Sequence, residues 1–238
     1  MTELLFRDDA YLRSCEAQIT AINERGGILL DRTLFYATGG GQPGDNGQIE
    51  FADGSKIDIA TTVFGETKSQ IVHVPAENQR IPEIGESVVL HVDWQKRYRY
   101  MRAHTALHLL SVAVPFPVTG GQISKDGGRL DFDIPEAGLD KEEIAEKTND
   151  LIAGDHGVSS EWITDEELAA NPGLVKTMSV KPPMGSGRVR LVRIGDSVDL
   201  QPCGGTHVLS TLEIGKIGIP KIEKKGRQNR RVRLALID

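Results

Sequence analysis

Two short segments of this chain carry side chains that commonly bind metal ions. Arg-Ala-His-Thr-Ala-Leu-His-Leu-Leu places His104 and His108 four residues apart, and Pro-Cys-Gly-Gly-Thr-His places Cys203 and His207 four apart. Two imidazoles at positions i and i+4 of a helix project from the same face, one turn apart. Imidazole nitrogen and thiolate sulfur are the ligands that Zn²⁺ prefers, in a tetrahedral set of four. The spacing therefore predicts one zinc site, formed when the fold brings these two segments together.

Each half of this pattern also has a simpler interpretation. A histidine pair on a helix, or a single C-x-x-x-H, also occurs without a metal, because histidine packs and hydrogen-bonds well. The two motifs together are more specific, since they use four of the eight Cys and His residues of the chain. The same histidine spacing occurs in the H-E-x-x-H motif of zinc proteases, whose glutamate is the general base. Thr105 occupies that position here, which argues against a zinc protease.

The composition restricts the class of protein. A chain of 238 residues can bury a sizeable core and form two domains. No apolar run approaches the roughly 20 residues of a membrane span, and the N-terminus lacks the pattern of a signal peptide. Only two cysteines are present, so a disulfide framework is excluded. We expect a cytoplasmic protein that makes no membrane contact.

Charge is unevenly distributed along the chain. The net charge of −6 does not by itself indicate a nucleic-acid-binding protein. However, residues 131–167 contain thirteen acidic residues and two lysines, whereas residues 216–233 contain eight basic residues and one glutamate. We expect a basic face for a phosphate backbone, with the acidic stretch turned away from it; the alternative is a solvated hairpin. A second basic group precedes His104 and consists of Lys96, Arg97, Arg99 and Arg102.

The first 92 residues have the pattern of a small antiparallel β-barrel. Residues 14–22 alternate between apolar and polar, and a turn separates them from Ile28-Leu29-Leu30. A second hairpin has its turn at Asp53-Gly54. Further short strands are expected at 71–74 and 88–92. Short strands at even spacing with tight turns are typical of barrels.

From residue 93 onward the pattern predicts an α+β domain. Asp93 can cap a helix that begins at Trp94 and ends before Pro115, and this helix would carry the histidine pair. Further helices are expected after Asp140 and Thr164, and Gly120-Gly121 is interpreted as a turn. The expected strands cover 130–134, 189–194, 199–201, 218–223 and 230–237. We therefore predict a barrel domain over 1–92 and an α+β domain over 93–238, with helices against a largely antiparallel sheet.

The segment 31–47 is rich in glycine. Five glycines in nine residues permit positive φ angles and a close approach of the backbone to a ligand. It is not a Walker loop, because no Gly-Lys-Ser/Thr follows, and no G-x-G-x-x-G opens a helix there. We interpret Gly39, Gly40, Gly41 and Gln42 as one wall of a substrate site, with their backbone N–H groups turned inward. The alternative is an irregular barrel loop.

Three motifs together resemble the freestanding alanyl-tRNA editing proteins of the AlaX type. They are His-Thr-Ala-Leu-His, Cys-Gly-Gly-Thr-His and Thr-Leu-Phe-Tyr…Gly-Gly-Gly-Gln-Pro-Gly-Asp. They are also similar to the editing domain of alanyl-tRNA synthetase, and the match covers nearly the whole chain in the expected order. The resemblance implies a β-barrel followed by the α+β editing domain shared with threonyl-tRNA synthetase, with zinc at the four ligands. It also implies deacylation of tRNA(Ala) mischarged with serine or glycine, and the medium-length class.

The resemblance assigns roles to further residues. Thr33 matches the threonine that recognises serine, although it is otherwise an ordinary β-branched strand residue. Gln122 matches an active-site glutamine, since an amide can orient water or bind a carbonyl; otherwise it is a turn residue. The basic stretch supplies the expected RNA contacts, which are Lys224, Lys225, Arg227, Arg230 and Arg231.

Several mechanisms stay open at this point. Zinc can activate water, polarise the carbonyl, or hold the amino group of the substrate. Four protein ligands are typical of a closed, structural site, whereas catalytic sites usually keep one position open. No Asp or Glu lies beside either metal motif, so no general base is evident. The alternatives to an esterase are a zinc-stabilised tRNA-binding module without catalysis and a different zinc hydrolase such as an amidase.

Overall fold

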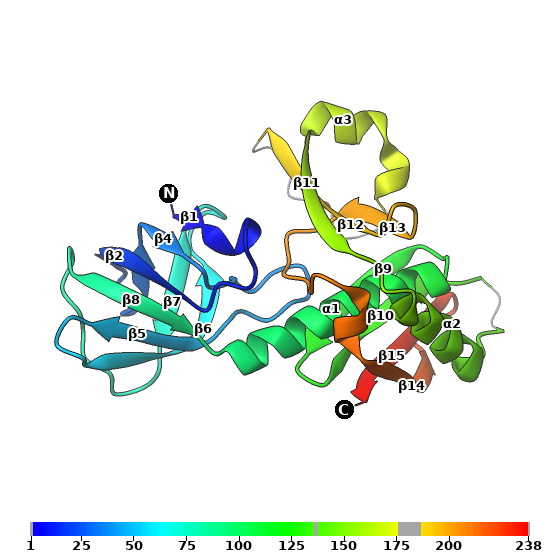
Figure 1. The fold of residues 1–238 in the computed structure, drawn as a ribbon, viewed down its shortest axis with the longest axis horizontal. Coiled ribbons are helices and arrows are strands. Elements are labelled where there is room, and N and C mark those ends of the chain that lie inside the picture. The colour runs from blue at the N-terminus through cyan, green and yellow to red at the C-terminus, as the bar shows by residue number, and fades with distance from the viewer. Residues whose placement is uncertain (1, 136–137, 176–186, 238) are drawn as a thin grey trace. The chain divides into compact units, whose positions relative to one another are not determined.

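The computed structural model describes residues 2–135, 138–175 and 187–237. The chain divides into two compact units, Met1–Tyr98 and Arg99–Asp238. The boundary lies within helix α1 (Trp94–Ala113), so this helix begins in the first unit and continues in the second (Figure 1). None of the helices in these described ranges combines the length and the apolar character that crossing a membrane requires.

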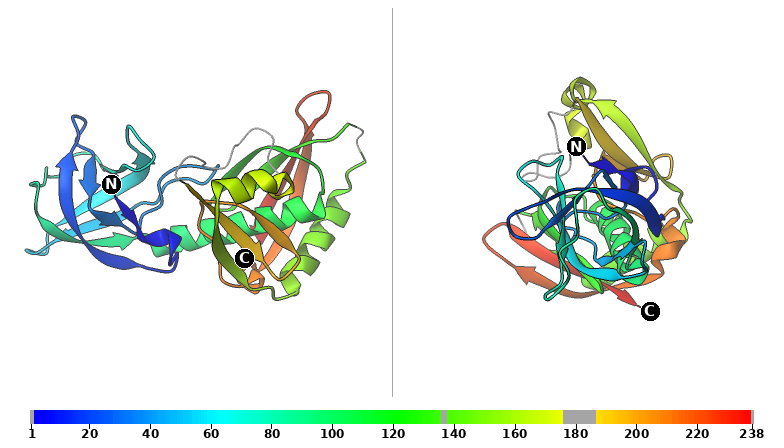
Figure 2. Two further views of the ribbon diagram at one scale, coloured as in Figure 1. Left: turned by 90° about the horizontal axis from the view of Figure 1, so that it is seen from above. Right: turned by 90° about the vertical axis from the view of Figure 1, so that its left-hand side faces the viewer.

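The first unit is a closed antiparallel β-barrel, as predicted (Figure 2). Its strands follow one another around the barrel in the order β2, β3, β7, β6, β5 and β8. A short parallel pair, β1 (Glu3–Leu4) and β4 (Arg32–Thr33), lies outside this ring. The barrel strands are β2 (Ser14–Ile22), β3 (Ile28–Leu30), β5 (Gly47–Phe51), β6 (Lys56–Phe64), β7 (Ile71–Pro75) and β8 (Ser87–Val92).

Alternation in these strands builds the core of the barrel. Along β2 the side chains of Ala17 and Ile19 are buried while their neighbours are exposed, because successive residues of a strand point to opposite faces. The turn at Asp53-Gly54 joins β5 to β6, and Gly54 has a φ of 80°, which is favourable only without a Cβ. Local pattern and turn chemistry thus agree in specifying this hairpin.

The second unit contains two antiparallel sheets and the helices α1, α2 and α3. One sheet has the strand order β14-β15-β10-β9 and the other β11-β12-β13 (Figure 1). Helix α2 packs against β14, where the side chain of Asn149 bonds both the N–H and the C=O of Ile217. The bounds are β9 (Val118–Ser124), β10 (Gly127–Asp133), α2 (Lys141–Ala153), β11 (Val158–Thr164), α3 (Asp165–Ala170), β12 (Arg188–Ile194), β13 (Asp199–Pro202), β14 (Lys216–Lys224) and β15 (Asn229–Ile237).

The predicted helix starts are confirmed by their capping bonds. The Asp93 carboxylate accepts from the backbone N–H of Lys96 at 3.2 Å, and Asp140 caps α2 in the same way. Thr164 and Glu167 form a reciprocal capping box at the start of α3. These side chains satisfy backbone donors that have no partner inside the helix.

Two local predictions were wrong. Gly120 and Gly121 do not form a turn; they lie within β9 and pair with Asp131 and Leu130 of β10. A Cβ at Gly121 would lie 3.0 Å from the Leu130 side chain, so glycine serves close packing there. Strand β11 was missed, because its Ser-Ser-Glu core lacks the apolar alternation of a strand. It forms through pairing with β12 along its whole length.

Candidate metal centre

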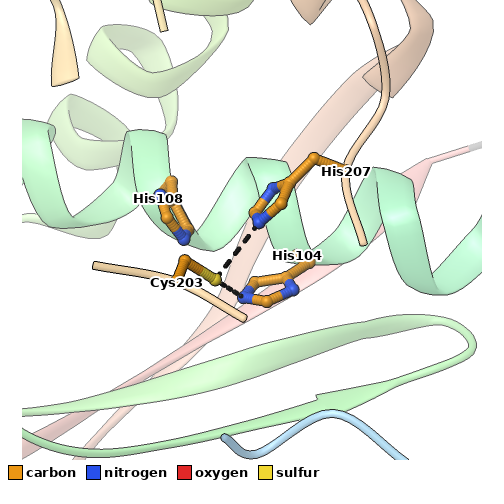
Figure 3. Close-up of side chains that lie close together, drawn as sticks. All are labelled: His104, His108, Cys203 and His207. Atoms are coloured by element: carbon orange, nitrogen blue, oxygen red, sulfur yellow. Dashed lines mark hydrogen bonds between the residues drawn. The ribbon is translucent and has the colours of Figure 1, made fainter. Parts of the chain in front are cut away.

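The structure brings His104, His108, Cys203 and His207 together within the second unit. Figure 3 shows the two histidines of α1 facing the segment that follows β13, which carries the other two residues. One ligand atom from each residue lies within 4.8 Å of the others. The Cys203 Sγ atom lies 3.3 Å from the Nε2 of His207 and 3.5 Å from the Nε2 of His104. All three histidines are buried.

This arrangement fits a metal ion by its donors and its spacing. A tetrahedral Zn²⁺ with bonds of about 2.3 Å to sulfur and about 2.05 Å to nitrogen separates those ligand atoms by about 3.5 Å. The two sulfur-to-nitrogen distances of 3.3 and 3.5 Å are close to that separation. A soft thiolate and three imidazoles suit a borderline-soft ion such as Zn²⁺. The cluster can therefore hold a metal ion.

The surroundings also favour the metal-binding forms of two of these groups, Cys203 and His207. Burial alone would raise the pKa of the Cys203 thiol, but His104 and His207 outweigh it and lower that pKa well below its usual value. Burial lowers the pKa of His207 to about 3. Burial would also lower the pKa of His108, but Asp199 and Cys203 outweigh it and raise that pKa to about 9, so a metal that binds His108 must displace a proton. The thiolate form of Cys203 and the neutral form of His207 are thus favoured, and metal binding requires both forms.

Two side chains beside this cluster were not predicted from the sequence. Asp199 and Gln201 alternate along β13 and both contact His108, at 3.0 and 3.1 Å from its Nδ1. Alternate residues of a strand share a face. The spacing Asp-x-Gln-x-Cys before the second metal motif was therefore a usable signal for them.

The glycine-rich segment differs from the expectation of inward-turned N–H groups. The N–H of Gly39 donates to the C=O of Gln42 at 3.0 Å, and the N–H of Gln42 donates back at 2.9 Å. Gly40 and Gly41 form the tip between them with φ angles of 57° and 82°. The amides of Gly39 and Gln42 therefore close a tight turn rather than face a ligand. Participation of these four residues in substrate binding stays a prediction.

One predicted basic residue is structural. Arg97 belongs to the second basic group, but its side chain is 0% exposed and pairs with Asp45, which is 1% exposed. Its guanidinium also donates to the carbonyl oxygens of Ala10 and Leu34. Asp45 in turn accepts from the N–H of Tyr36 at 2.6 Å, so the pair ties α1 to the glycine-rich segment within the first unit. Arg97 therefore cannot reach a phosphate group, because its side chain is buried in protein.

The hydroxyl of Thr33 is already hydrogen-bonded inside the barrel unit. The Nδ1 of His73 lies 3.1 Å from the C=O of Ile28 and donates to it, so its Nε2 accepts from the Thr33 hydroxyl at 2.8 Å. Burial lowers the pKa of His73 to about 4, which keeps this ring neutral. The Thr33 oxygen also accepts from the N–H of Phe35 at 3.0 Å. The Thr33 hydroxyl proton is therefore used in the bond to His73, and one lone pair of the Thr33 oxygen remains.

Gln122 lies on a strand rather than in a turn. It sits in β9 opposite Arg129 of β10, is exposed, and accepts from the Arg129 guanidinium at 3.3 Å. An exposed amide on a rigid sheet is available to a ligand. Its assignment as an active-site residue stays a prediction.

The basic stretch forms the β14–β15 hairpin, and acidic residues neutralise part of it. Asp131 accepts from Arg231 at 2.7 and 2.9 Å, so the first acidic residue of 131–167 lies inside this sheet rather than facing away. Glu223 accepts from Arg233, and that hydrogen bond lowers the pKa of Glu223 to about 2. Arg230 is buried and donates to nearby backbone carbonyl oxygens.

The predicted RNA contacts therefore fall into two groups. Arg230 and Arg231 are held by partners within the sheet, and RNA binding by these two stays a prediction. Lys224, Lys225 and Arg227 lie at the exposed end of the hairpin, where Lys225 makes a 3.6 Å ion pair with Glu223. For these three, RNA binding stays a prediction.

Comparisons with known proteins agree with the fold. The model of the "Threonyl and Alanyl tRNA synthetase second additional domain" matches residues 189–233, which include Cys203 and His207, and that of "tRNA synthetases class II (A)" matches residues 10–96. The alanyl-tRNA editing protein AlaX-M of Methanosarcina mazei is 34% identical over 100% of this chain and 98% of its own. AlaX-L of Pyrococcus horikoshii is 37% identical over 95% of this chain and 56% of its own. An alanine–tRNA ligase of Pyrobaculum arsenaticum is 35% identical over 94% of this chain and 25% of its own.

The full-length match decides the family. This chain belongs to the alanyl-tRNA editing proteins of the AlaX type, which confirms the resemblance seen in its motifs. The fold class is confirmed as well, since a closed antiparallel barrel precedes an α+β unit.

Proposed function

We propose that this protein is an aminoacyl-tRNA deacylase that removes serine, and also glycine, from mischarged tRNA(Ala) by hydrolysing the ester bond. The observation that carries the proposal is the full-length match to proteins named alanyl-tRNA editing proteins. The cluster of His104, His108, Cys203 and His207 supports it, because it places metal-binding groups in the second unit.

The proposed chemistry assigns a role to each group. The four clustered residues hold Zn²⁺, which when bound can polarise the ester carbonyl, activate water or bind the substrate amino group. Hydrolysis also needs stabilisation of a developing oxyanion and a positioned water. We assign the exposed amide of Gln122 to one of these tasks, since it can both donate and accept hydrogen bonds. Because no carboxylate lies among the four clustered residues, we assign no protein general base.

The direct test compares three substrates. Tritium-labelled serine, glycine or alanine would be attached to tRNA(Ala), and release of free amino acid would be followed with and without a chelator. The proposal expects release of serine and glycine, retention of alanine, and inhibition by the chelator. Binding of all three without release would contradict it and favour a zinc-stabilised tRNA-binding module, a role to which four protein ligands are suited.

Selection of serine is expected to depend on Thr33. We predict that Thr33→Val lowers the preference for serylated over alanylated tRNA(Ala) by about 1–2 kcal/mol, the value of one neutral hydrogen bond. The same substitution leaves the Nε2 of buried His73 without a donor, so the free energy of unfolding should fall by about 1–3 kcal/mol. Thr33→Ser is the control and should retain both properties. An unchanged ratio of kcat/KM together with lowered stability would show that Thr33 is purely structural.

We propose that the exposed end of the β14–β15 hairpin binds the acceptor stem of the tRNA. Double-stranded RNA presents phosphates and 2′-hydroxyls more readily than base edges. We predict that neutralising Lys224, Lys225 and Arg227 together weakens tRNA binding and flattens its dependence on salt. Each lost phosphate contact should remove roughly 0.7–0.9 from the slope of log K against log salt.

A matched control separates this contact from the effect of net charge. Neutralising Arg25, Lys56 and Lys68, which are exposed on the barrel unit, removes the same charge. This control should retain the slope of the parent protein, and both variants should retain their zinc. If the hairpin variant binds tRNA with the affinity of the parent and the same dependence on salt, the tRNA-binding surface lies elsewhere.

A further inference from the structure

A buried hydrogen-bond network lies behind the candidate metal ligands. The Oδ2 atom of Asp199 accepts from the Nδ1 of His108 at 3.0 Å and from the Nε2 of Gln201 at 2.7 Å. All three side chains are buried, and the side chain of Asp199 is 0% exposed. A buried carboxylate is costly unless its charge is compensated, so its position beside a metal-binding ring requires an explanation.

The chemistry of the network fixes the orientation of His108. An ionised carboxylate can only accept hydrogen bonds, so both atoms that contact Oδ2 must donate. The Nδ1 of His108 therefore donates its proton to Asp199, and Nε2 is the ring nitrogen that can bind a metal in place of a proton. The same requirement fixes the amide nitrogen of Gln201 toward Asp199.

His207 is held by a different partner, Thr105, which likewise fixes the orientation of its ring. The hydroxyl of Thr105 donates to the C=O of Met101 at 3.0 Å, so its oxygen accepts from the Nδ1 of His207 at 3.1 Å. The Nε2 of His207 is the atom that lies 3.3 Å from the Cys203 sulfur. Thr105, which replaces the glutamate of the zinc proteases, thus orients a ligand rather than acting as a base.

We propose that Asp199 is a positioning residue that holds His108 for the metal and supplies the last unit of compensating charge. Zn²⁺ with one thiolate and three neutral imidazoles carries a net charge of about +1. The carboxylate of Asp199 neutralises that charge inside the protein, where an unpaired charge is expensive. Ligand-orienting carboxylates of this kind typically contribute about 10–100-fold to metal affinity. The inference rests on the proposed metal site, but not on the identity of the tRNA substrate.

The test measures metal affinity without any tRNA. The dissociation constant for Zn²⁺ would be measured by competition with a chromophoric chelator for the full chain, Asp199→Asn and Asp199→Ala. We expect Asp199→Ala to bind Zn²⁺ about 10–100-fold more weakly than the parent. Asp199→Asn retains an acceptor for the Nδ1 proton but not the charge, so its loss should be smaller. Asp196→Asn is the control and should match the parent, because Asp196 is an exposed carboxylate in the turn that precedes β13.

A second readout separates positioning from folding. Co²⁺ bound at the site gives a ligand-field absorption that reports tetrahedral coordination, and it should weaken in Asp199→Ala but not in Asp196→Asn. Circular dichroism and thermal unfolding of the metal-free proteins should show that both Asp199 variants stay folded. If Asp199→Ala is unfolded, Asp199→Asn alone provides the test. Parent-like affinity and Co²⁺ spectra in a folded Asp199 variant would overturn the proposal. Failure of the parent itself to bind Zn²⁺ would instead overturn the metal site on which it rests.

Discussion

Replacing Cys203 with alanine is expected to remove both the bound metal and the deacylase activity. Cys203 is the only anionic ligand of the four, and the neighbouring histidines hold its pKa well below the usual value of a thiol, against the opposing effect of burial. Without the thiolate, three imidazoles must hold a dication in a buried site, where unpaired charge is costly. If the metal supplies several kcal/mol of transition-state stabilisation, serine release should slow by about 100- to 1000-fold.

The other cysteine of the chain provides a matched control. Cys15 lies on β2 in the barrel unit, and burial raises the pKa of its thiol to about 11, so it stays protonated. Cys15→Ala should keep the metal content and the rate of the parent, measured by elemental analysis and by serine release from serylated tRNA(Ala). A Cys203→Ala protein with one metal ion per chain and full activity would contradict the assignment of this residue as a ligand.

Replacing Arg97 with alanine is expected to destabilise the first unit by about 3–5 kcal/mol, because the change leaves the charge of Asp45 buried without its partner. Both side chains are almost completely excluded from water. The substitution also removes the donors to the carbonyl oxygens of Leu34 and Ala10. Urea denaturation followed by fluorescence would measure the loss as a shift in midpoint at constant slope.

Two further variants test whether the effect belongs to the ion pair. Arg99→Ala removes a partly exposed arginine two residues further along the same helix, and its cost should stay within about 0.5 kcal/mol. The double variant Arg97→Ala with Asp45→Ala should be destabilised by clearly less than the sum of the single changes, since no unpaired charge is left. An Arg97→Ala protein with the denaturation midpoint of the parent would show that the pair contributes nothing to stability.

Features encoded by neighbouring residues could be predicted from the sequence. Alternation identified the barrel strands, and Asp93, Asp140 and Thr164 marked the helix starts, because capping and strand periodicity act over a few residues. The convergence of the two metal motifs was also foreseeable. The side chains of both motifs are ligands that the same metal ion prefers. The chain between His108 and Cys203 gives no local indication of how the two motifs meet.

Features that depend on pairing between distant residues could not be predicted in this way. Arg97 looked like one of several cations on a helix, and only the folded structure shows that Asp45 lies against it. Gly120 and Gly121 looked like a turn, whereas tight packing against β10 places them in a strand. The partners of Arg231 and Glu223 likewise follow from strand register, which sets the exposed charge of the basic hairpin.

The central claim is that the cluster of His104, His108, Cys203 and His207 holds a zinc ion that hydrolysis of serylated tRNA(Ala) requires. The most direct measurement strips the protein of metal and follows the rate of serine release while Zn²⁺ is added back in defined steps. We expect almost no release from the stripped protein and a rise to a plateau at about one zinc per chain, as a single four-ligand site requires. A stripped protein that releases serine at the full rate, with no change as Zn²⁺ is added, would contradict the account.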